Sequence, residues 1–170
     1  KKLIEDQMDM SKASSGNVAV EITPTDVGEA VNQALGEFID KLEQRDLKVM
    51  LKAPSAPLMA RCDGRHLWRV LSNVLSNAVK YAMPGTRVYV DVLSREGQAE
   101  ISVKNISAEM LGVSADELLE RFVRGDSSRN TEGNGLGLNI ARSLMELQGG
   151  KLDLVVDGDL FKVVLKLKAA

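Results

Sequence analysis

The sequence is poor in several residue types, and each shortage excludes a class of protein. Of 170 residues, 4% are aromatic, and the chain holds one cysteine, Cys62, and one histidine, His66. A single cysteine excludes an internal disulfide and is typical of a reducing compartment. No apolar run approaches the ~20 residues of a membrane span, and no signal-peptide pattern is present. A net charge of -2 gives no reason to expect nucleic acid or direct membrane contact.

The remaining composition is that of an ordinary soluble globular protein. Hydrophobic residues make up 44% of the chain and charged residues 27%, and 170 residues suffice for one domain with a well-buried core. The chain opens on Lys1 instead of Met, so we expect a fragment of a longer protein, with any membrane segment upstream. The charged, Met-rich residues 1–16 end like a helix C-terminus. We therefore divide the chain into a helical remnant, residues 1–16, and one domain, residues 17–170.

Hydrophobic periodicity predicts the order of helices and strands. Helical spacing predicts a first helix from Asp26 to about Arg45 and a second that begins at Asp63 and is ended by Pro84-Gly85. It also predicts a short helix over 114–120 and a last helix from Leu136 to Gly149-Gly150. Alternation predicts strands over 18–22 (stopped by Pro24), 47–51 and 58–61, and hairpins pairing 88–93 with 99–103 and 152–156 with 161–167. Residues 105–113 are expected to be irregular. Together these elements predict a two-layer α/β sandwich, a mixed sheet with helices on one side.

The helix over residues 67–82 carries an unusual polar stripe. Asn73, Asn77 and Lys80 follow one another at helical spacing along the border of a wide apolar face, with Tyr81 beside them. Amide oxygens can coordinate a hard cation, and a lysine one turn further on can contact a phosphate. For a lone asparagine, a solvated polar face would be the better interpretation.

A long polar loop leads into the last helix. Residues 121–135 are glycine-rich and carry three arginines, and loops of this length in a compact domain are usually functional. The sequence Gly133-Asn134-Gly135-Leu136-Gly137-Leu138 opens the helix, where free backbone N–H groups attract phosphate. It is neither a Rossmann fingerprint nor a Walker loop, and a simple hinge or N-cap is the alternative. Arg121, Arg124 and Arg129 are ordinary surface cations or a phosphate clamp, and position favours Arg124 and Arg129.

Taken in order along the chain, these motifs resemble the catalytic and ATP-binding domain of bacterial sensor histidine kinases. Residues 73–81 match the N box of that family, residues 120–124 its F box, residues 133–138 its glycine box, and Gly149-Gly150 its last glycine pair. The resemblance covers residues 18–168, within the gyrase, chaperone and kinase ATPase superfamily. It implies the Bergerat ATP-binding fold with a flexible ATP lid. Residues 9–16 resemble the end of the second helix of the family's dimerisation hairpin.

The resemblance also implies cofactors and residue roles. It implies ATP and Mg²⁺, with the metal held by Asn77 and assisted by Asn73. Lys80, Arg124 and Arg129 would take the catalytic roles. The residues expected to line the nucleotide are Asn73, Asn77, Lys80, Tyr81, Asn105, Ser107, Phe122, Gly133, Asn134, Gly135, Leu136, Gly137 and Leu138.

The same resemblance implies partners and a place in the cell. The partners would be the protein's own dimerisation and phosphoacceptor domain, absent from this chain, and a response regulator. The full-length protein is expected to be a homodimer, with this part a cytoplasmic domain of a sensor in the inner or plasma membrane.

Asn73 and two departures from the family pattern shape the expected activity. Related hydrolases place a glutamate base where this chain has Asn73, and an amide cannot deprotonate water, so transfer of phosphate is favoured over hydrolysis. The usual adenine box, Asp-x-Gly-x-Gly, is replaced by a stretch with Asn105 and Ser107, which leaves a degenerate or purely regulatory module as the alternative. The family's acceptor histidine is missing, and His66 is expected to be structural, so no autophosphorylation is expected from this chain alone.

Overall fold

In the part of the chain that the structure describes, a five-stranded mixed sheet forms one layer and three helices form the other. The computed structural model describes residues 19–108 and 136–170; residues 1–18 and 109–135 are outside the described part. The elements are β1 (Thr23–Asp26), α2 (Val27–Gln44), β2 (Lys48–Lys52), β3 (Met59–Cys62), α3 (Gly64–Tyr81), β4 (Arg87–Arg95), β5 (Gln98–Ile106), α5 (Leu136–Leu147), β6 (Lys151–Asp157) and β7 (Leu160–Lys168).

The sheet has the order β2-β4-β5-β7-β6, with β2 parallel to β4 and every other pair antiparallel. Valines and isoleucines alternate along the strands with polar residues, so one face of the sheet is apolar. Cross-strand pairs such as Val90 with Val103 and Ile101 with Leu165 lie on that face, and all four side chains are buried. The mixed sheet and both predicted hairpins are therefore confirmed.

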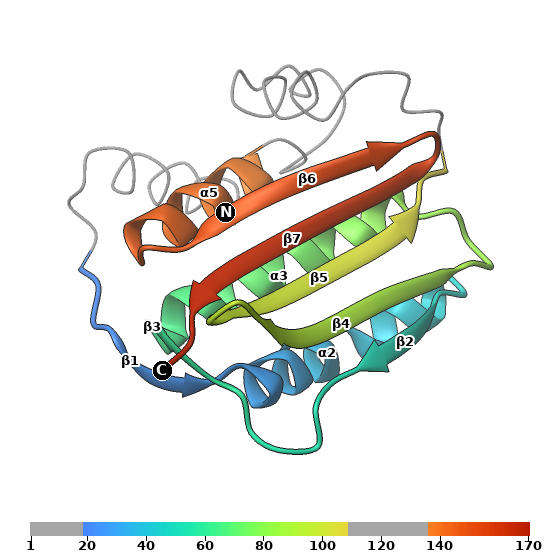
Figure 1. Ribbon diagram of the computed structural model, residues 1–170. Helices are drawn as coiled ribbons and strands as arrows, with labels where there is room; N and C mark the ends of the chain where they lie inside the picture. Colours follow the sequence, from blue (N-terminus) through green and yellow to red (C-terminus); the bar gives the residue numbers. More distant parts are fainter. Residues whose placement is uncertain (1–18, 109–135) are drawn as a thin grey trace.

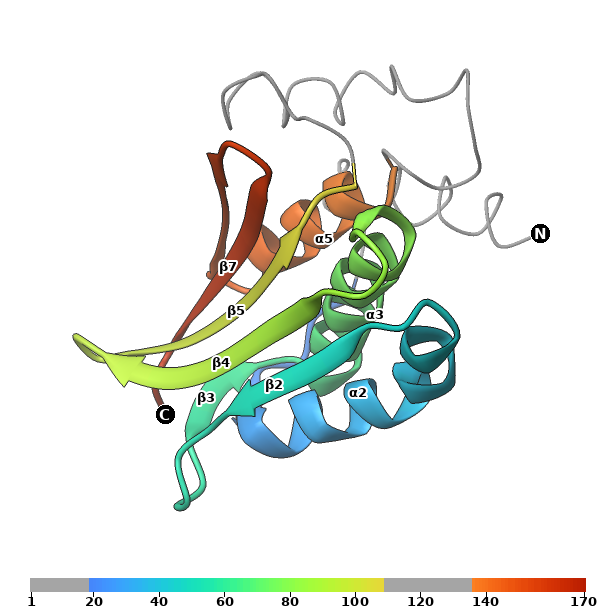
Figure 2. The same cartoon turned by 90° about the vertical axis from the view of Figure 1, so that its right-hand side faces the viewer.

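The three described helices cover this apolar face, and no described helix covers the other face of the sheet (Figure 1; the edge-on view in Figure 2). Helix α3 lies between α2 and α5 and contacts both. Its apolar stripe, predicted from the spacing, is buried at Leu67, Val70, Leu71, Val74, Leu75 and Ala78. The two-layer α/β sandwich is confirmed. No helix among the described residues is long and apolar enough to cross a membrane.

Two predicted boundaries are wrong. The expected strand over residues 18–22 is absent from the described residues 19–22, and β1 instead begins at Thr23 and includes Pro24. Pro24 is tolerated because β1 pairs only with β3, in a two-stranded sheet where one side of each strand needs no N–H donor. Asn105 and Ile106 were expected to be irregular, but they pair with β7 and belong to β5.

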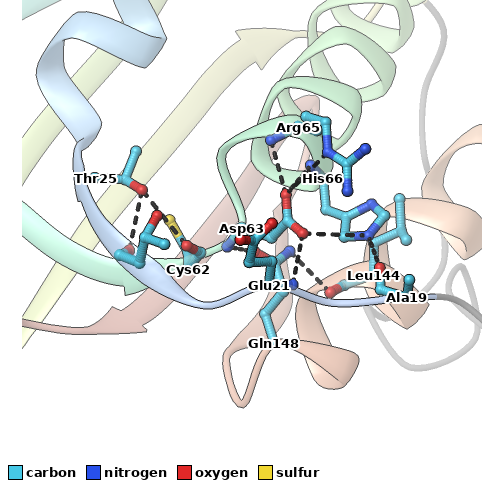
Figure 3. Close-up of polar contacts among 10 residues, drawn as sticks. Ala19, Glu21, Thr25, Cys62, Asp63, Arg65, His66, Leu144 and Gln148 are labelled. Atoms are coloured by element: carbon cyan, nitrogen blue, oxygen red, sulfur yellow. Dashed lines mark hydrogen bonds and ion pairs between the residues drawn. The ribbon is translucent and has the colours of Figure 1, made fainter.

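A buried polar network ties the start of α3 to the end of α5 (Figure 3). The carboxylate of Asp63 caps α3 by accepting from the N–H groups of Arg65, at 3.0 Å, and of His66, at 3.4 Å. The backbone N–H of Asp63 donates to Oε1 of Gln148 at 2.8 Å, and Nε2 of Gln148 donates to the carbonyl of Leu144 at 2.9 Å. The side chain of Asp63 is 3% exposed, so these bonds are shielded from water.

Two titrating groups sit side by side at this point. Burial raises the pKa of the Cys62 thiol above its ordinary 9.0, a contact with Thr25 opposes this, and the charge of Asp63 adds to it. Burial also acts to raise the pKa of Asp63. Hydrogen bonding from Glu21, the charge of His66 and the bonds from His66 and Arg65 outweigh burial and hold the pKa of Asp63 below its ordinary 3.8. The carboxylate is therefore ionised at neutral pH.

The lowered pKa of Asp63 predicts that the ionised carboxylate stabilises the fold and that acid removes this stabilisation. A group whose pKa is lower in the folded state stabilises the fold above its unfolded value, and this stability is lost as pH falls through the folded value. We expect Asp63→Asn to lower the free energy of unfolding at pH 7 by about 2 kcal/mol, the scale of a hydrogen bond to a charged group. The difference in free energy of unfolding between the variant and the unchanged protein should become smaller as the pH drops below 3.8. Urea unfolding of both proteins from pH 7 to pH 3 measures this difference in free energy. A difference that stays constant with pH would contradict the prediction.

Candidate functional site

Helix α3 presents the predicted polar stripe as a gradient of burial. Asn73 is 6% exposed, Asn77 and Tyr81 are half-buried, and Lys80 is exposed. These residues lie along the border of the buried stripe, and their exposure increases toward the helix C-terminus. The stripe therefore runs from a dry amide to a solvated ammonium group over two turns.

The start of α5 packs against the buried end of this stripe. A Cβ built on Gly137 would lie 3.9 Å from the Cβ of Asn73, so the first turn of α5 passes close to this amide. The Nδ2 atom of Asn73 is buried and has no hydrogen-bond partner among the described residues. A buried donor left without an acceptor costs about 1–3 kcal/mol. An anionic oxygen at the start of α5 would supply that acceptor and would also meet the positive end of the helix dipole.

The end of β5 lies against the C-terminal end of α3. Ile106 accepts from the N–H of Met83 at 2.8 Å, and Ala108 donates to the carbonyl of Tyr81 at 2.9 Å. Ser107 forms a bridge with Ala82. The strand thereby brings its two predicted site residues, Asn105 and Ser107, to the helix end that carries Lys80 and Tyr81. Asn105 is 3% exposed and Ser107 6% exposed.

Arg45, which the sequence did not single out, holds this helix end in place. It follows α2 directly, and its Nη2 atom donates to the carbonyl of Ala82 at 2.7 Å and to that of Lys80 at 3.4 Å. A guanidinium group at the C-terminus of a helix satisfies carbonyls that lack helical partners and is favoured by the helix dipole. A basic residue after a helix is too common to reveal such a contact from sequence alone.

The structure brings together part of the predicted set. These residues lie on the second half of α3, at and just after the end of β5, and in the first turn of α5: Asn73, Asn77, Lys80, Tyr81, Asn105, Ser107 and Gly137. Leu138 is 1% exposed and its side chain belongs to the hydrophobic core. Leu136 begins α5. The predictions for Phe122, Arg121, Arg124, Arg129, Gly133, Asn134 and Gly135, and those for residues 1–16, concern residues outside the described part.

Amide oxygens are the metal ligands that this part of the chain offers. Among residues 19–108 and 136–170, no group of three or more His, Cys, Asp or Glu side chains is placed to hold a metal ion. Amide oxygens suit a hard cation such as Mg²⁺, which keeps several waters and takes further oxygens from the phosphates it accompanies. A Mg²⁺–nucleotide complex therefore fits the donors present better than a metal ion alone.

Fold and geometry together define a class of α/β sandwich domain whose candidate ligand site lies between the central helix α3, the end of the middle strand β5 and the start of α5. Residues 62–169 match the family described as histidine kinase-, DNA gyrase B- and HSP90-like ATPases. The chain belongs to this family.

Individual relatives agree with this assignment. The sensor protein CzcS of Cupriavidus metallidurans is 30% identical over 156 residues, which are 91% of this chain and 32% of CzcS. The catalytic domain of the histidine kinase ThkA shares the fold with a TM-score of 0.75 at 20% identity, covering 87% of this chain and 95% of that one. Full-length ShkA, solved in complex with AMPPNP, has a TM-score of 0.81 at 21% identity, covering 99% of this chain and 35% of that one. The chain thus spans about a third of CzcS.

The Arg45 contacts predict a specific loss of nucleotide affinity. Arg45→Met removes both hydrogen bonds to the end of α3 and frees the turn that carries Lys80 and Tyr81. We expect the affinity for a non-hydrolysable ATP analogue to fall about fivefold, the scale of one net hydrogen bond. Isothermal titration calorimetry measures this, with Lys41→Met on the same helix as the control. Equal affinities for Arg45→Met and the unchanged chain would show that Arg45 does not position the site.

Proposed function

We propose that this chain binds ATP with Mg²⁺ and presents the γ-phosphate for transfer to a histidine of a dimerisation and phosphoacceptor domain, in two-component signalling. The observation that carries the proposal is the buried Asn73 amide, which has no hydrogen-bond partner among the described residues and lies beside Gly137. An amide at this position can donate a hydrogen bond to a phosphate, and it cannot act as a general base toward a water molecule. The chain would then be the catalytic domain of a protein-histidine kinase.

The proposed roles follow the burial gradient along α3. Asn77 would contribute an oxygen to Mg²⁺, with Asn73 assisting, and exposed Lys80 would contact a phosphate. Tyr81 and Asn105 would lie near the base, since β5 meets α3 at this end. Bound Mg²⁺ would neutralise charge on the β- and γ-phosphates. The chain's own residues would hold the phosphates in line and keep the adenine side of the site dry.

The remaining roles belong to the same proposal. Arg124 and Arg129 would approach the γ-phosphate from the lid, and the glycines at 133, 135 and 137 would let the backbone pass close to the phosphates. Phe122, Asn134 and Leu136 would complete the nucleotide-binding set, together with the backbone of Leu138, whose side chain lies in the core. A response regulator, a homodimeric parent and a cytoplasmic position beneath a membrane sensor complete the proposal for the whole protein.

Removal of the amide at position 77 tests the metal role. We expect Asn77→Ala to weaken binding of an ATP analogue about tenfold in the presence of Mg²⁺, and to have little effect in EDTA, because only the metal-dependent part is lost. Calorimetric titration with and without Mg²⁺ gives both numbers. The matched control is Asn32→Ala, which removes an exposed amide from α2. No binding by the unchanged chain, or the same loss with and without Mg²⁺, would refute the proposal.

A second function, that of a nucleotide-free regulatory module, is favoured by one observation. Asn105 is uncharged and 3% exposed, so its contact with an adenine amino group would lack the strength of a carboxylate contact. Asn105→Asp separates the two functions. If the chain is a kinase domain, the unchanged protein binds the analogue and the variant binds within about tenfold of it, the scale set by one charge-assisted hydrogen bond. A change from no measurable affinity to clear affinity would favour the regulatory module.

A further inference from the structure

The chain enters the domain through a short segment that two side chains hold by its backbone. Residues 19–22 belong to no helix or strand and lead into β1. The backbone N–H of Glu21 donates to Oδ2 of Asp63 at 2.9 Å, and Nε2 of His66 lies 2.6 Å from the carbonyl oxygen of Ala19 (Figure 3). A carbonyl can only accept, so Nε2 of His66 carries the proton and donates it. We call Asp63 and His66, with these two contacts, the clasp.

The clasp does more than a helix cap requires. Capping of α3 uses only Oδ1 of Asp63, which accepts from the N–H groups of Arg65 and His66. The second carboxylate oxygen and the imidazole both form hydrogen bonds with the backbone of residues 19–22, at groups two residues apart. Nε2 of His66 also lies 3.7 Å from Oδ2 of Asp63, so protonated His66 would reinforce the carboxylate. The bond from Glu21 is partly sheltered, since the side chain of Asp63 is 3% exposed, whereas the bond between His66 and Ala19 lies at the surface.

The clasp is connected to the candidate site by two helices. Asp63 begins α3, whose 18 residues span about 27 Å and carry Asn73 and Asn77 further along. Gln148, bonded to the backbone of Asp63, follows α5, whose first turn contacts Asn73 through Gly137. A helix is more rigid along its axis than a loop, so a displacement at one end of a helix moves the other end as well. The incoming chain is thus held at one end of the same two helices whose other parts form the site.

We propose that Asp63 and His66 are positioning residues that fix the point where the preceding chain leaves the domain, and so set where a phosphoacceptor joined upstream lies relative to the γ-phosphate. The inference rests on the proposed function for its catalytic consequence. It requires that the clasp affect transfer to an acceptor joined through residues 1–18, while ATP binding and transfer to a separate acceptor stay unchanged.

The functional experiment compares transfer to one acceptor hairpin in two arrangements, joined ahead of Lys1 and supplied separately. His66→Phe keeps the ring volume and removes the donor. We expect it to slow transfer to the joined hairpin about fivefold, the scale of one lost hydrogen bond. Affinity for the ATP analogue and transfer to the separate hairpin should stay within about twofold of the unchanged chain. His66→Gln, which offers an amide donor, should restore part of the loss. Arg61→Gln, at an exposed side chain on β3, should have no effect.

Amide hydrogen exchange of the intact chain tests the clasp directly, without reference to catalysis. Asp63→Asn keeps an oxygen to cap α3 and replaces the acceptor of the Glu21 N–H. We expect exchange at Glu21 to rise about tenfold or more in this variant. If Asp63→Asn does not fold, exchange at residues 19–21 in His66→Phe decides instead. Unchanged exchange in a folded variant would overturn the clasp.

The two proposals fail in different ways. If the unchanged chain neither binds the analogue nor transfers phosphate, the proposed function fails, and the exchange rates alone decide whether the clasp exists. If His66→Phe slows joined and separate transfer equally, the clasp is only structural and the positioning role is wrong. If joined transfer is unaffected, the positioning role is likewise wrong.

Discussion

The geometry of the domain depends on how helix α3 buries one face. Six of its apolar side chains are inserted between the sheet and the flanking helices, and a helix so fixed cannot rotate about its axis without exposing them. Because side chains follow one another at 3.6 residues per turn, burial of that stripe also dictates where the bordering residues point. Asn73 is drawn into the dry interior and Lys80 is left in water. Hydrophobic packing of the apolar face therefore orients the polar stripe.

The ends of α3 are fixed by polar contacts from distant parts of the chain. At the start, Asp63 caps the helix and is bonded to Gln148, 85 residues away. At the other end, Arg45 caps the carbonyls of Lys80 and Ala82, 35 and 37 residues away. The apolar face sets the rotation of the helix, and these polar contacts set its position along its axis. Both are needed for a site built from three elements, since a shift along the axis would separate Asn73 from Gly137.

Local patterns in the sequence predict this fold well, and contacts between distant residues are predicted poorly. Helix α2 with its Asp26 cap, helix α3 with its Asp63 cap and both hairpins follow from spacing within about 20 residues. The strand expected over 18–22 was wrong because alternation reveals only a capacity for pairing. The segment that pairs is β1, and its partner residues in β3 lie 33 to 39 positions further on. The stripe of Asn73, Asn77 and Lys80 was predictable because it lies on one helix. The roles of Arg45 and Gln148 were not, because a carbonyl or an N–H elsewhere in the fold leaves no trace in local sequence.

The burial of Cys62 has a practical consequence for distance measurements. Its side chain, at the end of β3, is fully buried, and burial raises the pKa of its thiol, so few of these thiols are reactive thiolates at neutral pH. A cysteine placed on the surface would react with a maleimide or a spin label far faster than the native one. Pairs of labels could then be introduced by adding two residues, with the natural thiol left in place and the packing around it undisturbed.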